Sequence, residues 1–241
     1  MRTFALIIAI AIAPPLLAQK YTHLGFEFGT TSSLIQSEKN SDITGVNDDI
    51  SPIFGINFRK ELSKIFSLET GIYYRTYSEY IGIKNLINSG TGGFSSHQIP
   101  IKLFADLDLT QKISFHAALG YSLNIEGYGS GGSGISYQDG DRLSMKYTSL
   151  NESAFYSLIS GSAGARFRIY DELLLTLSIG YNHGFRPIRE YEVTYWDSSG
   201  NSLSNTFTSN GDYWHLTCNI SYPLSKILNM LSILDWNNDR L

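Results

Sequence analysis

The chain has 241 residues, of which 42% are hydrophobic and only 17% are charged, and this balance excludes a disordered protein. The net charge is −4 and the basic residues form no cluster, so the sequence shows no nucleic-acid-binding surface. The single cysteine, Cys218, allows neither an intramolecular disulfide nor a zinc site with paired thiolates.

Residues 1–18 have the layout of a secretory signal peptide. Arg2 supplies a positive start, an apolar run extends from Phe4 to Ala13, and Ala18 is the small residue before the expected cleavage site. The run is shorter than the roughly 17–25 apolar residues of a transmembrane helix, and two prolines follow it. We therefore expect an exported protein whose folded part begins after residue 18.

Residues 19–223 contain eight segments in which apolar and polar side chains alternate, the period of a strand with one apolar face. The composition agrees, because aromatic residues make up 13% of the chain and 22 glycines accompany only 6 prolines. In chain order the predicted strands cover residues 23–29, 53–60, 66–75, 98–107, 114–124, 155–167, 173–182 and 213–222.

Short and long connections between these segments alternate strictly. The short connections are residues 61–64, 108–112 and 169–172, and the long polar ones are residues 31–50, 81–96, 126–153 and 185–212. One rim must therefore carry the long connections, and the other must carry the turns and both termini. This wiring predicts an all-β fold, an eight-stranded antiparallel up-and-down transmembrane β-barrel with long extracellular loops and short periplasmic turns. We expect it in the outer membrane of a Gram-negative bacterium, surrounded by lipid.

The polar faces of the strands combine glycine and serine with charges of both signs. An eight-stranded barrel has room inside only for side chains, so we expect a packed polar interior and no open pore. The predicted interior network consists of Glu27, Arg59, Glu69, Arg75, Lys102, Asp106, His116, Arg166 and His215. Aromatic residues near the ends of the apolar faces predict two interfacial girdles, formed by Tyr21, Phe66, Tyr74, Tyr121, Tyr181, Trp214 and Tyr222.

The segment His97 to Asn124, HQIPIKLFADLDLTQKISFHAALGYSLN, resembles the PorT-like outer-membrane β-barrel family of Bacteroidetes. The matching features are Ile99-Pro100-Ile101-Lys102 at the start of a strand and Gly120-Tyr121 near the end of the next. Gly161 to Gly184 resembles a later hairpin of the same family. The resemblance implies an outer-membrane barrel and a role in the envelope, since one member is associated with a secretion system. Barrels of this kind commonly end at an aromatic residue of the last strand, whereas this chain continues past Tyr222.

The continuation, residues 224–241, is predicted to be a periplasmic tail. Leu224, Ile227, Leu228, Leu231 and Leu234 recur at helical spacing, which favours a short amphipathic helix against the membrane surface or a partner. A frayed tail is the alternative.

The sequence shows few features of a catalytic or ligand-binding site. The five histidines lack metal-ligand spacing, and we predict no catalytic site, no cofactor and no metal site. Gly127 to Gly134 is expected to be a flexible loop, because no lysine or helix follows to make a phosphate site. Asn40, Asp42, Asp48 and Asp49 lack the spacing of a calcium loop.

A hairpin around residues 191–207 is expected to project beyond the membrane, where Tyr191, Tyr195, Trp196 and Phe207 would form an aromatic docking patch. A solvated loop is the alternative. The sequence therefore predicts a structural or partner-docking barrel, with another envelope protein bound through the loops or the tail. One alternative is a lipid A-modifying enzyme that uses His183 as its base, although no nucleophile is specified. The other is a soluble secreted barrel of the lipocalin type with an apolar ligand inside.

Overall fold

The computed structural model describes residues 22–37, 43–46, 50–83, 87–90, 93–126, 131–138, 140–150, 155–170 and 172–230. The predicted signal peptide, Tyr21 and residues 231–241 lie outside these ranges, and so do Asn40, Asp42, Asp48 and Asp49, which lack calcium-loop spacing.

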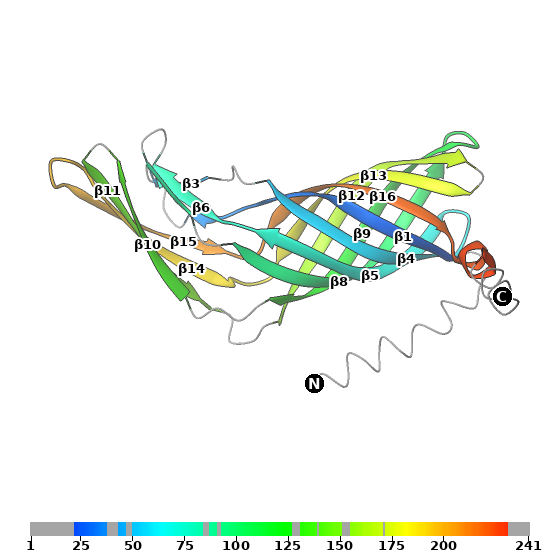
Figure 1. The fold of residues 1–241 in the computed structure, drawn as a ribbon, viewed down its shortest axis with the longest axis horizontal. Helices are drawn as coiled ribbons and strands as arrows, with labels where there is room; N and C mark the ends of the chain where they lie inside the picture. Colours follow the sequence, from blue (N-terminus) through cyan, green and yellow to red (C-terminus); the bar gives the residue numbers. More distant parts are fainter. Residues whose placement is uncertain are drawn as a thin grey trace, which may run out of the picture.

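Eight long strands form a closed barrel, as predicted (Figure 1). They are β1 (Thr22–Ser33), β4 (Ser51–Glu61), β5 (Phe66–Tyr77), β8 (Phe94–Asp108), β9 (Ile113–Glu126), β12 (Phe155–Tyr170), β13 (Leu173–Gly184) and β16 (Tyr213–Pro223). Each strand pairs antiparallel with its two neighbours, in the order β1-β16-β13-β12-β9-β8-β5-β4. The register that closes the barrel runs from His23 opposite Pro223 to Ser33 opposite Tyr213.

The period-two pattern places polar side chains inside the barrel and apolar side chains outside. On β9, Ser114, His116 and Ala118 are buried, whereas Phe115 and Leu119 are 51% and 72% exposed. A soluble protein would expose its polar side chains instead, so this distribution is that of a barrel whose outer surface contacts lipid.

Two of the short turns are built alike. Ser63 Oγ accepts hydrogen bonds from the amides of Ile65 and Phe66, at 3.2 and 3.0 Å. Thr110 Oγ1 accepts in the same way from the amides of Lys112 and Ile113, at 3.1 and 3.0 Å. A hydroxyl that satisfies two amides stabilises a tight turn, which fixes the register of the two strands that it joins.

Most of the long connections between the barrel strands are themselves strands. A five-stranded sheet has the order β10 (Gly131–Gln138), β11 (Asp141–Ser149), β14 (Arg189–Trp196), β15 (Ser202–Ser209) and β2 (Gln36–Ser37). A three-stranded sheet contains β3 (Ile43–Val46), β6 (Tyr80–Ile83) and β7 (Ile87–Gly90). Together these two sheets are called the extension, which continues the long axis of the barrel (Figure 1).

The extension has a hydrophobic core of its own, made of Ile81, Leu143, Met145, Tyr191, Val193 and Phe207. The expectation of a flexible loop is therefore wrong for residues 131–134, because β10 pairs with β11 from Gly131 opposite Thr148 onward. Residues 127–130 lie outside the described part of the chain.

A helix over residues 224–230 directly follows β16, within the segment whose spacing predicted one. Leu224 is buried, whereas Leu228 and Met230 are half exposed. Within the described residues, no helix is long and apolar enough to cross a membrane.

Candidate functional site

All nine residues of the predicted polar network lie on inward-facing positions of the barrel strands, where they form separate clusters. In the middle of the barrel, Lys102 Nζ lies 3.4 Å from Glu69 Oε1 and 4.0 Å from Glu27 Oε1. The hydroxyl of Tyr73 donates towards both carboxylates, at 3.3 Å to Glu27 and 3.4 Å to Glu69, and accepts a hydrogen bond from Asn57 at 3.0 Å. The inward parity of β4 and β5 could have identified Asn57 and Tyr73 as members of this cluster.

A second cluster lies closer to the turns. Arg59 binds both carboxylate oxygens of Asp106 through Nη2, at 3.1 and 2.8 Å, and its Nε donates to Ser67 Oγ at 2.8 Å. Arg166 Nη2 lies 3.0 Å from Asp106 Oδ1. Two guanidinium groups therefore share one carboxylate, which leaves this cluster with a net positive charge.

The two inward histidines lie against glycines of neighbouring strands. His116 Nε2 is 3.1 Å from Ser178 Oγ, and a Cβ at Gly164 would come within 2.7 Å of the His116 ring. His215 Nδ1 is 3.0 Å from Asn182 Nδ2, and a Cβ at Gly180 would come within 2.5 Å of the His215 ring. Both histidines occupy space that these glycines leave open, as packed interior residues do.

Arg75 lies in an aromatic layer that closes the barrel below the extension. Its guanidinium carbon is 4.1 Å from the ring centroid of Tyr77 and 3.9 Å from that of Tyr213. The side chain is fully buried, and none of its three nitrogens has a hydrogen-bond partner. Tyr213 also packs with Tyr156, Leu158 and Ile188 in a buried cluster. The buried charge of Arg75 is therefore stabilised by stacking on the two aromatic rings.

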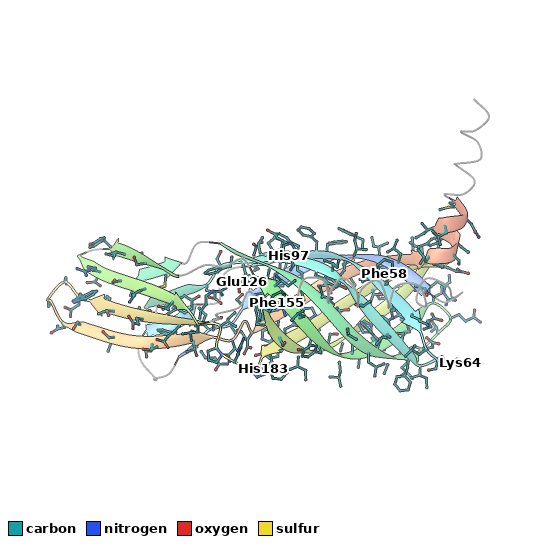
Figure 2. All side chains as sticks on the ribbon, turned by 90° about the horizontal axis from the view of Figure 1, so that it is seen from below. Phe58, Lys64, His97, Glu126, Phe155 and His183 are labelled. Atoms are coloured by element: carbon teal, nitrogen blue, oxygen red, sulfur yellow. The ribbon has the colours of Figure 1, made fainter. Side chains whose placement is uncertain are left out.

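A further ionic cluster joins the barrel to the extension. Arg189 forms ion pairs with Glu126 and with Glu79, the latter at 3.4 Å, and donates to the hydroxyl of Tyr77 at 2.8 Å. Glu79 also accepts hydrogen bonds from Tyr191 and Ser209. In Figure 2, Glu126 lies where the barrel strands give way to the extension. Sequence reasoning missed this cluster, because Glu79 and Arg189 fall in or beside connections that were expected to be loops.

The described members of the predicted aromatic girdles face outward. Tyr181 and Trp214 are paired across β13 and β16 with ring centroids 4.9 Å apart, and Tyr74 packs against His97 at 5.3 Å. His97, Phe155 and His183 lie close to the same level along the barrel in Figure 2, and Lys64 lies at the opposite end. Phe66 and Tyr222 are near the turn end, whereas Tyr74, Tyr121, Tyr181 and Trp214 are near the extension.

The four residues of the predicted docking patch do not form an exposed aromatic surface. Tyr191 and Phe207 are completely buried, because their side chains fill the core of the extension. Tyr195 donates to Asp141 at 2.6 Å, and Trp196 lies under the guanidinium of Arg142 at 4.1 Å. The prediction of an exposed patch is wrong for Tyr191 and Phe207, because the period-two pattern that marks a hairpin does not show which face a second sheet covers.

His183 has an acidic partner that the sequence did not indicate. Its Nδ1 is 3.2 Å from Oδ2 of Asp212, and the Asp212 side chain is only 1% exposed. The same carboxylate accepts hydrogen bonds from the hydroxyl of Tyr181 at 3.0 Å, the amide of Gly184 at 2.7 Å and the side chain of Gln36 at 3.3 Å. His183 is thus held with its other ring nitrogen directed away from Asp212, at the outer surface where the barrel meets the extension (Figure 2).

No protein-family model and no curated protein matches the chain. Among solved structures, the outer membrane protein OprG from Pseudomonas aeruginosa is 12% identical with a TM-score of 0.48, covering 85% of this chain and 97% of OprG. Neisserial surface protein A is 11% identical with a TM-score of 0.47, covering 84% and 96% of the two chains. A major outer membrane protein from Thermus thermophilus is 10% identical with a TM-score of 0.43, covering 83% and 98%. At such values no role transfers from these proteins to this chain.

The architecture rests instead on the strand pairing and on the distribution of side chains. A closed barrel of eight antiparallel strands has short turns at one end, charges inside and apolar side chains outside. These are the features of an outer-membrane β-barrel.

Proposed function

We propose that this outer-membrane barrel serves as a rigid anchor for a docking surface on the extension. The observation that carries the proposal is the outer edge of β10. This strand is the terminal strand of its sheet, and within the described residues no strand pairs with that edge. An edge normally carries a charge or a proline that prevents pairing with another chain, and β10 has neither.

Two large side chains of β10 face solvent next to this edge, beside the exposed polar residues Ser133 and Gln138. Ile135 and Tyr137 are 53% and 72% exposed on alternate positions of β10. An extended segment of a second envelope protein can add to such an edge by main-chain hydrogen bonds, with its side chains selected by the exposed pair.

The closed interior supports docking over transport. Eight strands leave no aqueous channel when side chains fill the barrel, and the layer around Arg75 fills it at the level of the extension. The ionic cluster of Arg189, Glu79 and Glu126 then fixes the extension to the barrel, so that the edge is held in one orientation.

The test replaces Ile135 by lysine, which places a charge on the β10 edge. Leu203→Lys is the matched control, because Leu203 lies at the other side of the same sheet and is 39% exposed. We expect proteins that co-purify with the native barrel from solubilised envelopes to be lost from Ile135→Lys and kept by Leu203→Lys. Both variants must keep the heat-dependent gel mobility of a folded barrel.

A photo-reactive residue in place of Tyr137 provides a second readout. We expect it to cross-link to the same co-purifying protein in intact cells. Equal co-purification by native protein and Ile135→Lys would overturn the proposal.

The resemblance to PorT-like barrels gives this proposal its finer form, in which the partner is a component of a secretion or envelope complex. The tail from residue 224 onward offers a second contact on the periplasmic side. Deletion of residues 224–241 would show which of the two contacts holds the partner, because a partner bound at β10 stays bound in that variant.

A second candidate function is modification of lipid A. The observation that favours it is the pairing of His183 with the buried Asp212, an arrangement that orients a histidine as a general base. Within the described residues, no hydroxyl group hydrogen-bonds to His183, and this candidate uses a bound water as the nucleophile. This candidate predicts a change in lipid A mass on expression of the native protein that is absent with His183→Ala.

The soluble barrel with an apolar ligand does not fit the geometry. Its apolar side chains would line the interior, whereas here the interior holds charged clusters and the exposed face holds residues such as Leu119 and Ile179.

A further inference from the structure

A pocket of about 270 Å³ opens at the turn end of the barrel. Its rim includes Ser63 and Lys64 of one turn and Thr110 and Lys112 of another, and its inner wall includes Asp106 and Arg166. A smaller cavity of about 20 Å³ lies deeper and shares Arg166 in its lining. We call the larger pocket the vestibule; water occupies roughly 30 Å³ per molecule in the liquid, so the vestibule can hold a small hydrated ligand.

The vestibule is basic although the chain as a whole has a net charge of −4. Among the residues that the structure describes, four basic side chains and three acidic ones line it, namely Lys64, Lys112, Arg166 and Arg168 against Glu61, Asp106 and Asp108. Arg59 adds a fifth basic group beside Asp106. The low-dielectric walls of the barrel strengthen the field of these groups, so anions are attracted to this end.

Arg166 has unused hydrogen-bonding capacity. The carboxylate of Asp106 accepts hydrogen bonds from Arg59 and from Ser67. Arg166 Nη2 is close enough for an ion pair with Asp106 but forms no hydrogen bond, and it is buried. A guanidinium group has five N–H donors, so Arg166 can bind a further acceptor without giving up its pairing.

Arg59 and Arg166 approach this point from opposite walls of the barrel. They lie on β4 and β12, which are four strands apart in either direction around the eight-stranded ring. Asp106 lies between them and neutralises one of the two charges. An oxyanion in the vestibule would therefore accept hydrogen bonds from the remaining donors of Arg166, and the charge of Arg59 beyond Asp106 would add to the attraction.

We propose that the vestibule binds the phosphate group of a small molecule or lipid headgroup, with Arg166 as the main donor and Arg59 as the supporting charge. The site opens towards the turns, so the ligand enters from the periplasmic side. The shared chemistry is a phosphate oxyanion, and its source is either free phosphate or a phospholipid of the periplasmic leaflet.

The test is isothermal titration of the folded full chain in detergent micelles, first with inorganic phosphate and then with dihexanoyl phosphatidylglycerol. Arg166→Gln removes the main donor, and we expect it to weaken binding at least tenfold. Arg142→Gln is the matched control, since it makes the same charge change in the extension and should bind like the native protein.

Ser114→Asp provides an independent variant, because Ser114 lies opposite Arg166 in the β9–β12 register and also lines the vestibule. Its carboxylate would occupy the free donors of Arg166, so we expect phosphate binding to be lost while the barrel stays folded. The expected pattern is binding by the native protein and Arg142→Gln, and weakened or lost binding by Arg166→Gln and Ser114→Asp. If inorganic phosphate gives this pattern, the ligand is free phosphate. If only phosphatidylglycerol gives it, the ligand is a lipid. Absence of binding with both probes, or equal binding by native protein and Arg166→Gln, would overturn the proposal.

Discussion

At the scale of single residues, glycine at an inward position is required where a large interior side chain lies on the neighbouring strand. Gly180 illustrates this, because the ring of His215 occupies the space that a side chain would need. Gly161 faces outward instead, and a Cβ there would meet nothing closer than Leu119 at 4.0 Å. The same residue type therefore has a packing role at one position and none at the other.

Gly180→Ala should destabilise the barrel by about 1–3 kcal/mol, since the added methyl group displaces His215 from Asn182. Gly161→Ala is the control and should change stability by less than about 0.5 kcal/mol. Urea unfolding of both variants in lipid vesicles, followed by tryptophan fluorescence, measures the difference. Equal midpoints would show that the His215 position is not fixed as described.

Lys102 is a residue whose removal leaves two buried carboxylates without a cation. Lys102→Met should lower the free energy of unfolding by about 3–5 kcal/mol, because Glu27 and Glu69 then repel each other in the interior. Lys146→Met is the comparison, since its ion pair with Glu192 is about two-thirds exposed and should contribute below about 1 kcal/mol. Urea unfolding in lipid vesicles measures both variants. If Lys102→Met lowers the free energy of unfolding no more than Lys146→Met does, the interior pairing is contradicted.

At the scale of elements, the β14–β15 hairpin depends on its turn. The amide of Gly200 donates to the Asp197 carbonyl at 3.0 Å, and Gly200 has a φ of 87°, a conformation that favours glycine. The carboxylate of Asp197 accepts hydrogen bonds from the Asn201 side chain at 2.7 Å and from the backbone amides of Ser199 and Asn201. One carboxylate thus organises the tip of the hairpin.

The hydrogen bonds from Asn201 lower the pKa of Asp197 below its ordinary value of 3.8. Because the lowered pKa belongs to the folded turn, its stabilisation is complete above pH 3.8 and is lost as the pH falls through the lower value. We expect the side-chain amide resonance of Asn201 to titrate with a midpoint below 3.8, and no such titration in Asp197→Asn. A midpoint at or above 3.8 would contradict the turn geometry.

At the scale of the whole molecule, the barrel has two differently built ends. The turn end has short connections and a basic vestibule, whereas the other end is closed by aromatic side chains and continues into the extension. A lipid belt lies between them, so each end is in contact with a different aqueous compartment.

Accessibility of cysteines to a membrane-impermeant maleimide tests this orientation. The native Cys218 faces the belt and should stay unlabelled in intact cells. In a Cys218→Ser background, Ser204→Cys in the extension should be labelled in intact cells, and Thr110→Cys only after the outer membrane is opened. Labelling of Thr110→Cys in intact cells, with Ser204→Cys protected, would reverse the orientation.

The sequence by itself determined the eight barrel strands and the face that each residue occupies, because a strand has a fixed period of two and one apolar face was required throughout. It also determined which charges of the predicted strands lie inside the barrel, but not the buried charges of Glu79 and Arg189 at the junction with the extension. The tertiary structure alone decided how they pair, for example that Arg59 and Arg166 share Asp106, since these contacts depend on register and on which strands face each other across the ring. The same holds for the extension: Tyr191 and Phe207 have the pattern of an exposed hairpin, and only packing of the strands showed that they form a core.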